Sequence, residues 1–213
     1  MNTIARYPCA RYVIGVTLIE MMVAVLVLSV GLLGIAGLQA ATAKYKINTW
    51  SRSQASVLLS DLAERLRINP EAAGTTFGGN GETATSLYVL GDNWTTQQAA
   101  DLSADPNPNC ETAACTSTER AAFDLLMWRK RVREGMPQGA ALVSGNRAEG
   151  IDVTMMWFDK EMLDQTTNTA ATPTLVKAPV CAGTETGMAQ QSCCPADTAA
   201  PEGVRCARFS FVP

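Results

Sequence analysis

A chain of 213 residues is long enough for one globular domain beside its N-terminal segment. Its formal net charge is −3 and 17% of its residues are charged, so the charge balance indicates neither a nucleic-acid-binding surface nor a disordered acidic tail. The chain has no histidine, which is the usual general base and the commonest metal ligand. We therefore expect no enzymatic activity, no cofactor and no metal site.

The N-terminal segment combines a basic start with a long apolar run. Residues 1–14 contain Arg6 and Arg11 and no acid, and residues 21–43 carry no charge. A secretory signal has an apolar stretch of about 7–15 residues. This stretch runs for roughly 20 residues, enough to cross a bilayer as a helix. The sequence therefore predicts a membrane-spanning segment.

Glu20 lies inside this apolar segment, between Ile19 and Met21. An ionised carboxylate at bilayer depth costs on the order of 3 kcal/mol unless it is paired or near the interface, and such residues are functional candidates. The alternative is that Glu20 lies at the headgroup edge, where its charge is tolerated. We favour a functional role in which another group neutralises the carboxylate.

Residues 15–28 resemble the class III signal of type IV prepilins and type II secretion pseudopilins. The resemblance is carried by GVTLIE at 15–20 and the apolar run MMVAVLVL at 21–28. It implies that a prepilin peptidase cuts after Gly15 and methylates the new amine of Val16, where the family usually has phenylalanine or methionine. It also implies that Glu20 attracts the N-terminal amine of a neighbouring subunit, since opposite charges in a low dielectric attract strongly.

A single long helix is predicted from residue 16 to residue 69. No proline interrupts this stretch, and Pro70 supplies a stop. Beyond Lys44 the pattern becomes amphipathic, with apolar residues at helical spacings: Ile47, Trp50, Val57, Leu58, Leu62 and Leu66. The predicted organisation has four parts: a leader (1–15), a transmembrane or filament-core half-helix (16–43), an amphipathic half-helix (44–69) and a periplasmic head (70–213).

The head is predicted to contain a second helix after a loop-rich region. Residues 71–117 form that region, with one short strand at 86–90. Ser117 or Thr118 is expected to cap a helix over residues 119–134. Its expected buried stripe consists of Ala122, Leu125, Trp128 and Val132.

Three strands are expected in the rest of the head, at residues 140–143, 151–158 and 205–212, with a turn around Gly145 and Asn146. An antiparallel sheet packed on a helix satisfies this pattern. The predicted fold class is therefore α+β and type IV pilin-like, with a long N-terminal helix packed on a small antiparallel sheet in a loop-rich, disulfide-containing head.

Four basic residues cluster near the end of the second predicted helix: Arg129, Lys130, Arg131 and Arg133. A nucleic-acid or acidic-lipid surface is one interpretation of this cluster. The other is a solvated helix face whose cations complement the helix dipole. We favour the second because the chain as a whole is acidic, and we expect no nucleic-acid partner.

Seven cysteines occur in the chain, and Cys9 falls in the predicted leader. The remaining six suit disulfides in an oxidising compartment, with free or metal-bound thiols as the alternative. We expect one bond between Cys110 and Cys115, and an improbable geometry for adjacent Cys193 and Cys194. The six candidates are Cys110, Cys115, Cys181, Cys193, Cys194 and Cys206.

The head also resembles minor pilins of the PilV type, through the AFDLxxW pattern at 122–128, the MPxG pattern at 136–139 and a strand ending near Trp157. This resemblance implies a minor pilin that primes type IV pilus assembly near the filament tip. Its implied partners are prepilin peptidase, other minor pilins, the major pilin, a tip adhesin and, before assembly, inner-membrane lipid. The implied location is the bacterial inner membrane, with a periplasmic head, and then the pilus tip.

Two other functions fit the same sequence. A minor pseudopilin of a type II secretion system would use the same leader and helix. A single-pass anchored binding protein would have the same apolar segment, but it would not be cleaved at Gly15.

Overall fold

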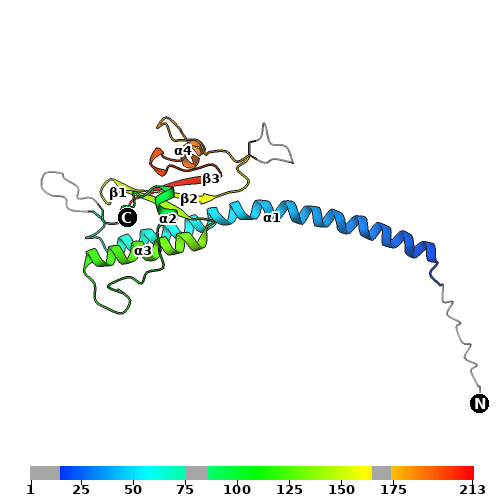
Figure 1. Ribbon diagram of the computed structural model, residues 1–213, viewed down its shortest axis with the longest axis horizontal. Coiled ribbons are helices and arrows are strands. Elements are labelled where there is room, and N and C mark those ends of the chain that lie inside the picture. The colour runs from blue at the N-terminus through cyan, green and yellow to red at the C-terminus, as the bar shows by residue number, and fades with distance from the viewer. Residues whose placement is uncertain (1–14, 75–85, 165–173) are drawn as a thin grey trace, which may run out of the picture. The chain divides into compact units, whose positions relative to one another are not determined.

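The computed structural model describes residues 15–74, 86–164 and 174–213 (Figure 1). Cys9 and most of the predicted leader therefore lie outside the described residues. The chain divides into two compact units, Met1–Lys44 and Tyr45–Pro213. Each unit is described by itself below.

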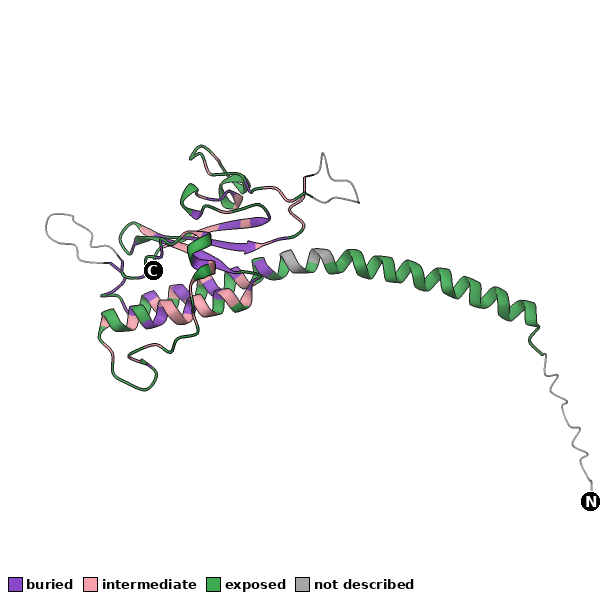
Figure 2. Cartoon of the chain, viewed as in Figure 1, coloured by how far each residue is buried: buried purple, intermediate pink, exposed green. Residues whose placement is uncertain are grey.

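The N-terminal unit is dominated by the first part of α1 (Leu18–Ile68), a helix of 51 residues. The long helix predicted from the sequence is confirmed, beginning two residues later and ending one residue earlier than expected. Leu18–Ala43 has a mean hydropathy of 2.5 and is long and apolar enough to cross a membrane. Figure 2 shows this stretch exposed.

The C-terminal unit, which we call the head, is built on the second part of α1. Four residues at helical spacings in this part are buried: Ala55, Leu58, Leu62 and Leu66. They pack in one cluster with Trp128 and Val132 of α3 (Ser117–Gly135) and with the inner face of the sheet. The amphipathic pattern of the sequence thus places the helix against the core of the head.

The sheet has three antiparallel strands in the order β1 (Ala140–Asn146), β2 (Gly150–Phe158) and β3 (Val204–Phe211). The central strand is buried on both faces. Alternate residues of β2 pack against α1 and α3: Ile151, Val153, Met155 and Trp157.

The other face of the sheet is covered by a second apolar cluster. Met156 of β2 contacts this cluster, which includes Trp94 of the short helix α2 (Trp94–Ala99). The loop between β2 and β3 supplies Ala178 and Cys194 to the same cluster. That loop also contains α4 (Met188–Ser192) and a short 3-10 helix, Ala196–Thr198. The sheet of the head is therefore covered on both faces, by α1 and α3 on one face and by α2 and the β2–β3 loop on the other.

The second predicted helix is present, but its predicted cap and part of its stripe are wrong. Thr116 is the N-cap, because its hydroxyl accepts from the Glu119 N–H while the Glu119 carboxylate accepts from the Thr116 N–H. Ala122 is exposed, and Ala121 and Phe123 are buried instead. The core wraps further around α3 than a narrow stripe predicts.

The predicted turn at Gly145 and Asn146 is also wrong, since both residues belong to β1 and residues 147–149 form the turn. Gly145 has φ +93°, and a Cβ there would lie 2.2 Å from the carbonyl oxygen of Gly150. Glycine is needed at this position because any side chain would clash with the opposite strand of the hairpin. The Asn146 side chain accepts hydrogen bonds from the N–H groups of Ala148 and Glu149, which holds the turn.

The short strand predicted at 86–90 is reduced to a single bridge between Leu90 and Val143. Both main-chain hydrogen bonds of this bridge are present, at 2.9 and 3.0 Å. They occupy the outer edge of β1, so that edge is paired at this point.

Candidate assembly interface

The apolar part of α1 has no packing partner within the described chain. Its large side chains are exposed, as illustrated by Leu18 at 79% and Leu33 at 73%. An exposed apolar surface of this extent requires lipid or other protein around it in the working state of the molecule. This helix is therefore the first candidate for an assembly surface.

Thr17 starts α1. Its carbonyl oxygen accepts from the N–H of Met21 at 3.2 Å, and its hydroxyl accepts from the N–H of Glu20 at 3.4 Å. Glu20 thereby occupies the first turn, where the helix dipole favours a negative charge. No cation of the described residues lies within 4.0 Å of its carboxylate. The carboxylate is available to a positive group from outside this part of the chain.

Gly15 and Val16 precede the helix in an exposed, irregular segment. A Cβ added to Gly15 would meet no atom within 4 Å. Packing in the described chain therefore gives no reason for a glycine at this position. An exposed, irregular peptide next to a helix start is accessible to a peptidase.

A buried polar network fixes α1 to the head. The guanidinium of Arg65 donates to the carboxylate of Asp124 in α3 at 2.7 Å, and the hydroxyl of Tyr88 donates to the same carboxylate at 2.9 Å. The Asn69 amide donates to the Tyr88 hydroxyl at 3.2 Å. Burial, reinforced by the Asp124 carboxylate, raises the pKa of Tyr88 above its ordinary range. Asp61 completes the network from one helical turn before Arg65, at 3.2 Å.

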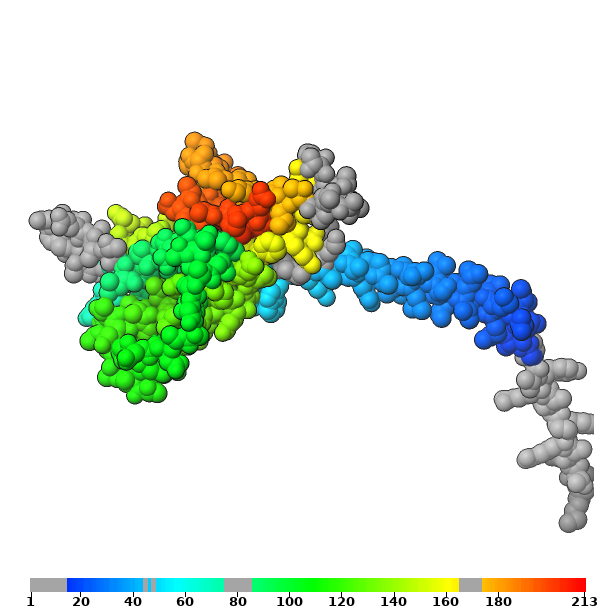
Figure 3. All heavy atoms as spheres, viewed as in Figure 1, coloured from blue at the N-terminus to red at the C-terminus, as the bar shows by residue number. Residues whose placement is uncertain are grey.

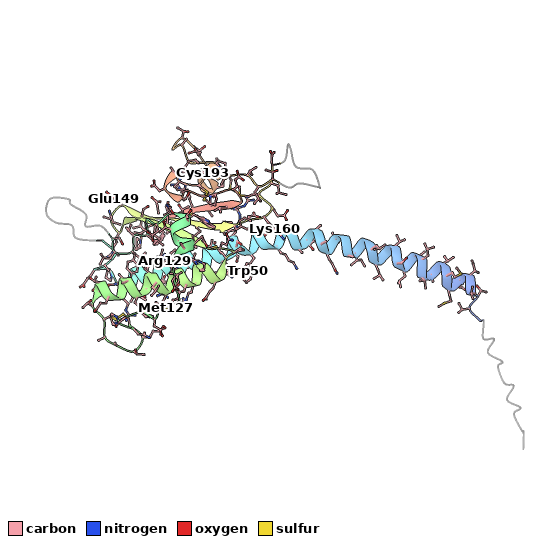
Figure 4. The ribbon with its side chains drawn as sticks, in the orientation of Figure 1. Trp50, Met127, Arg129, Glu149, Lys160 and Cys193 are labelled. Carbon is pink, nitrogen blue, oxygen red and sulfur yellow. A yellow bond between two sulfur atoms is a disulfide. The ribbon has the colours of Figure 1, made fainter. Side chains whose placement is uncertain are left out.

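The basic residues of α3 are engaged within the head. Arg131 pairs with Asp61 at 3.1 Å, and Arg129 lies 3.7 Å from Asp92. Arg133 donates to the carbonyl oxygen of Gln97, and Lys130 donates to that of Ala104 at 3.0 Å. Figure 4 labels Arg129 on α3. These cations hold α1, α2 and the following loop against α3.

The six cysteines of the head form three disulfides. Cys110 is joined to Cys115 in the loop before α3. Cys181 is joined to Cys193, and Cys194 to Cys206, so the adjacent pair belongs to two different bridges. Figure 4 labels Cys193 beside α4. Among the described residues, no group of His, Cys, Asp or Glu side chains is arranged to hold a metal ion.

A long apolar helix with a first-turn carboxylate, followed by a small antiparallel sheet in a disulfide-containing head, is a type IV pilin-like α+β fold. Residues 11–36 match the prokaryotic N-terminal methylation motif. Residues 37–126 match the Tt1218-like family, described as type IV pilin Tt1218. Searches of curated proteins and of solved structures gave no match.

Residues 37–126 are thus similar to a type IV pilin family, and they directly follow a match to the N-terminal methylation motif. The motif implies processing by prepilin peptidase and assembly with other pilins. Together with the apolar helix it fits inner-membrane anchoring followed by pilus assembly. The pilin family is structural and not enzymatic.

The roles of Gly15, Val16 and Glu20 remain predictions from the sequence, and the network around Tyr88 was not predicted. Arg65 and Asp124 are 59 residues apart, and Tyr88 stands in a loop-rich stretch. The usable signal was an arginine on the core side of an amphipathic helix, since a guanidinium there needs an acidic partner.

Proposed function

We propose that this chain is a minor pilin that primes type IV pilus assembly and lies at or near the filament tip with other minor pilins. The observation that carries the proposal is Glu20, a first-turn carboxylate on an uncovered apolar helix with no cation nearby in the described chain. The methylation motif over the same residues supports it.

In this proposal the peptidase cuts between Gly15 and Val16 and methylates the amine of Val16. The new amine is positive and stands beside the first turn of α1. Glu20 of one subunit attracts the amine of the next, because a single buried charge is penalised and a pair is not. Each subunit supplies one amine and accepts another, so head-to-tail contacts generate a staggered filament.

The minor, tip-proximal role is supported by the build of the head. Loop 100–116 and much of loop 174–203 are exposed, and each contains a disulfide. Loops positioned by a rigid scaffold are common binding elements. In the proposal they contact other minor pilins, the major pilin or a tip adhesin. The PilV-type pattern at 122–139 also favours a minor pilin.

Deletion of the gene tests the proposal. We expect fewer surface pili while the major pilin stays in the membrane, and partial recovery of fibres in a strain that cannot retract them. The protein should also be scarce in sheared pili relative to the main subunit. Loss of exoprotein secretion with intact pili would assign it to a type II secretion system instead.

A further inference from the structure

The outer edge of β3 is unpaired over its second half. β3 is the last strand of the sheet, and its other neighbour is β2. Just beyond the strands, the N–H of Asp159 donates to the carbonyl oxygen of Gly203 at 2.7 Å. In an antiparallel ladder, pairs of residues that are hydrogen-bonded to each other alternate with pairs that are not. The bond between Asp159 and Gly203 marks the first kind of pair, and every second pair along the strands is of the same kind. Ala207 and Phe209 therefore direct their main-chain groups toward β2, and Arg208 and Ser210 direct theirs outward.

The outward N–H and C=O groups of Arg208 and Ser210 have no hydrogen-bond partner within the described part of the chain. β1 differs at its own edge, where Val143 is paired with Leu90. A row of free main-chain donors and acceptors is a template for another strand. The β1 edge of the sheet is thus paired at Val143, whereas the β3 edge is unpaired at Arg208 and Ser210 among the described residues.

A groove of about 430 Å³ lies along the open edge. Leu59 of α1 forms one wall, and the exposed residues Gln190 and Gln191 of α4 contribute to the other. Figure 3 shows the α4 region, in orange, next to β3, in red. The remaining lining comes from Arg208, Phe209 and Ser210 of the edge strand itself.

Arg208 gives the groove a positive charge without a close carboxylate. Its guanidinium lies 3.7 Å from the Sγ of Cys181 and 3.9 Å from the Sγ of Cys193, and sulfur is a weak acceptor. No acid of the described chain is within 4.0 Å of it. Glu185 is attracted to Arg208, but its carboxylate already accepts from the N–H groups of Ala182 and Gly183.

We propose that an extended segment of a partner pilus protein adds to this edge as a fourth strand and pairs an acidic side chain with Arg208. Main-chain hydrogen bonds to Arg208 and Ser210 would hold the segment, as in other cases of strand addition. Side chains alternate across a strand. The segment therefore needs an apolar residue over Leu59 and Phe209 next to an acid on the Arg208 side. That the partner is a pilus protein rests on the proposed function.

Site-specific photo-crosslinking in full-length protein tests this inference. Benzoylphenylalanine replaces Gln190 in the groove or, as a matched control, Val180, which is exposed in the same loop and outside the groove lining. In piliated cells we expect an adduct from position 190 and not from position 180. Mass spectrometry should map it to an extended segment with adjacent apolar and acidic residues.

Charge substitutions make the test specific. Arg208→Glu should reduce the adduct about tenfold, the equivalent of one charge-assisted hydrogen bond, while Arg208→Lys should retain most of it. Equal amounts of disulfide-bonded protein in the membrane show that both variants fold. No adduct at position 190, an adduct insensitive to Arg208→Glu, or an adduct with a second copy of this chain would overturn the inference.

The same samples separate the inference from the proposed function. If the chain is found in sheared pili but gives no adduct at position 190, the edge-strand inference fails and the minor-pilin function stands. If the adduct forms with the expected charge dependence but the chain never enters pili, the proposed function fails and the strand-addition site stands.

Discussion

The indole Nε1 of Trp128 in α3 donates a hydrogen bond of 2.8 Å to the carbonyl oxygen of Leu58 in α1. This bond crosses the contact between the two helices of the head, and Trp128 is fully buried. It ties the side chain of one helix to the main chain of the other. The position of α3 on α1 is thus fixed by a directed contact as well as by apolar packing.

Replacing Trp128 with phenylalanine should lower the free energy of unfolding of the head by about 1–3 kcal/mol, because a buried hydrogen bond and part of an apolar contact are lost. Urea unfolding followed by circular dichroism would measure this. Trp50→Phe is the matched control, since Trp50 is 60% exposed (labelled in Figure 4) and should change stability by less than about 0.5 kcal/mol. Equal effects at both positions would contradict the role assigned to Trp128.

Tyr88 should make the head sensitive to alkali. Burial raises the pKa of Tyr88 above its ordinary value of 10.0, so the folded state holds this proton more tightly than the unfolded state. The resulting stability is complete below about pH 10 and is lost as the pH rises further. Between about pH 9 and 12, the free energy of unfolding should fall more steeply with pH for the native protein than for Tyr88→Phe. The same pH dependence of the free energy of unfolding in both proteins would show that Tyr88 ionises freely in the folded head.

Thr116, and not Thr118, should stabilise the start of α3. Thr116→Ala removes the side-chain half of the capping box and should cost about 1 kcal/mol. Thr118→Ala is the control, because Thr118 is exposed in the first turn and is not the cap. Comparison of the two midpoints in urea decides between the positions.

The same capping box predicts acid sensitivity. The N–H of Thr116 holds the pKa of Glu119 below its ordinary value. The stability from this carboxylate is therefore present above its unfolded pKa of about 4.3 and is lost as the pH falls below it. Glu119→Gln should weaken that dependence near pH 4. An unchanged acid profile would remove Glu119 from the cap.

Glu20→Gln should reduce recovery of the full-length protein in sheared pili about tenfold, because the amine of a neighbouring subunit would lose its charged partner. Glu64→Gln is the matched control on the same helix: Glu64 is exposed and pairs with Arg67 at the surface. Immunoblots of sheared pili and membranes would measure both. Equal recovery of the two variants would remove Glu20 from subunit docking.

Much of the fold could be predicted because its larger elements carry their own periodic patterns. Apolar spacing and Pro70 bounded α1, and alternation in 151–158 indicated the central strand. β1 extends to Asn146, beyond the predicted end at residue 143, because pairing with β2 recruits polar residues that show no alternation. The short helices α2 and α4 are only 6 and 5 residues long, too short to leave a periodic signal.

The candidate site divides in the same way. The residues around Gly15 and Glu20 are contiguous, so a motif in the sequence displays them together. The groove beside Arg208 depends on which strand ends the sheet, and on Leu59 and Gln190 meeting there from distant segments. No local pattern encodes such a meeting, because strand order is set by packing of the whole head.

The neighbouring cysteines Cys193 and Cys194 close two successive rings, and in each ring the two bonded cysteines are 12 positions apart. The peptide bond between Cys193 and Cys194 joins the two rings. The two rings together cover the chain from Cys181 to Cys206, and Cys206 lies in β3. A protease that cuts once within either ring opens it without releasing a fragment, because both new ends stay covalently attached to the sheet. The head can thus be nicked within this loop and still keep every part of its surface.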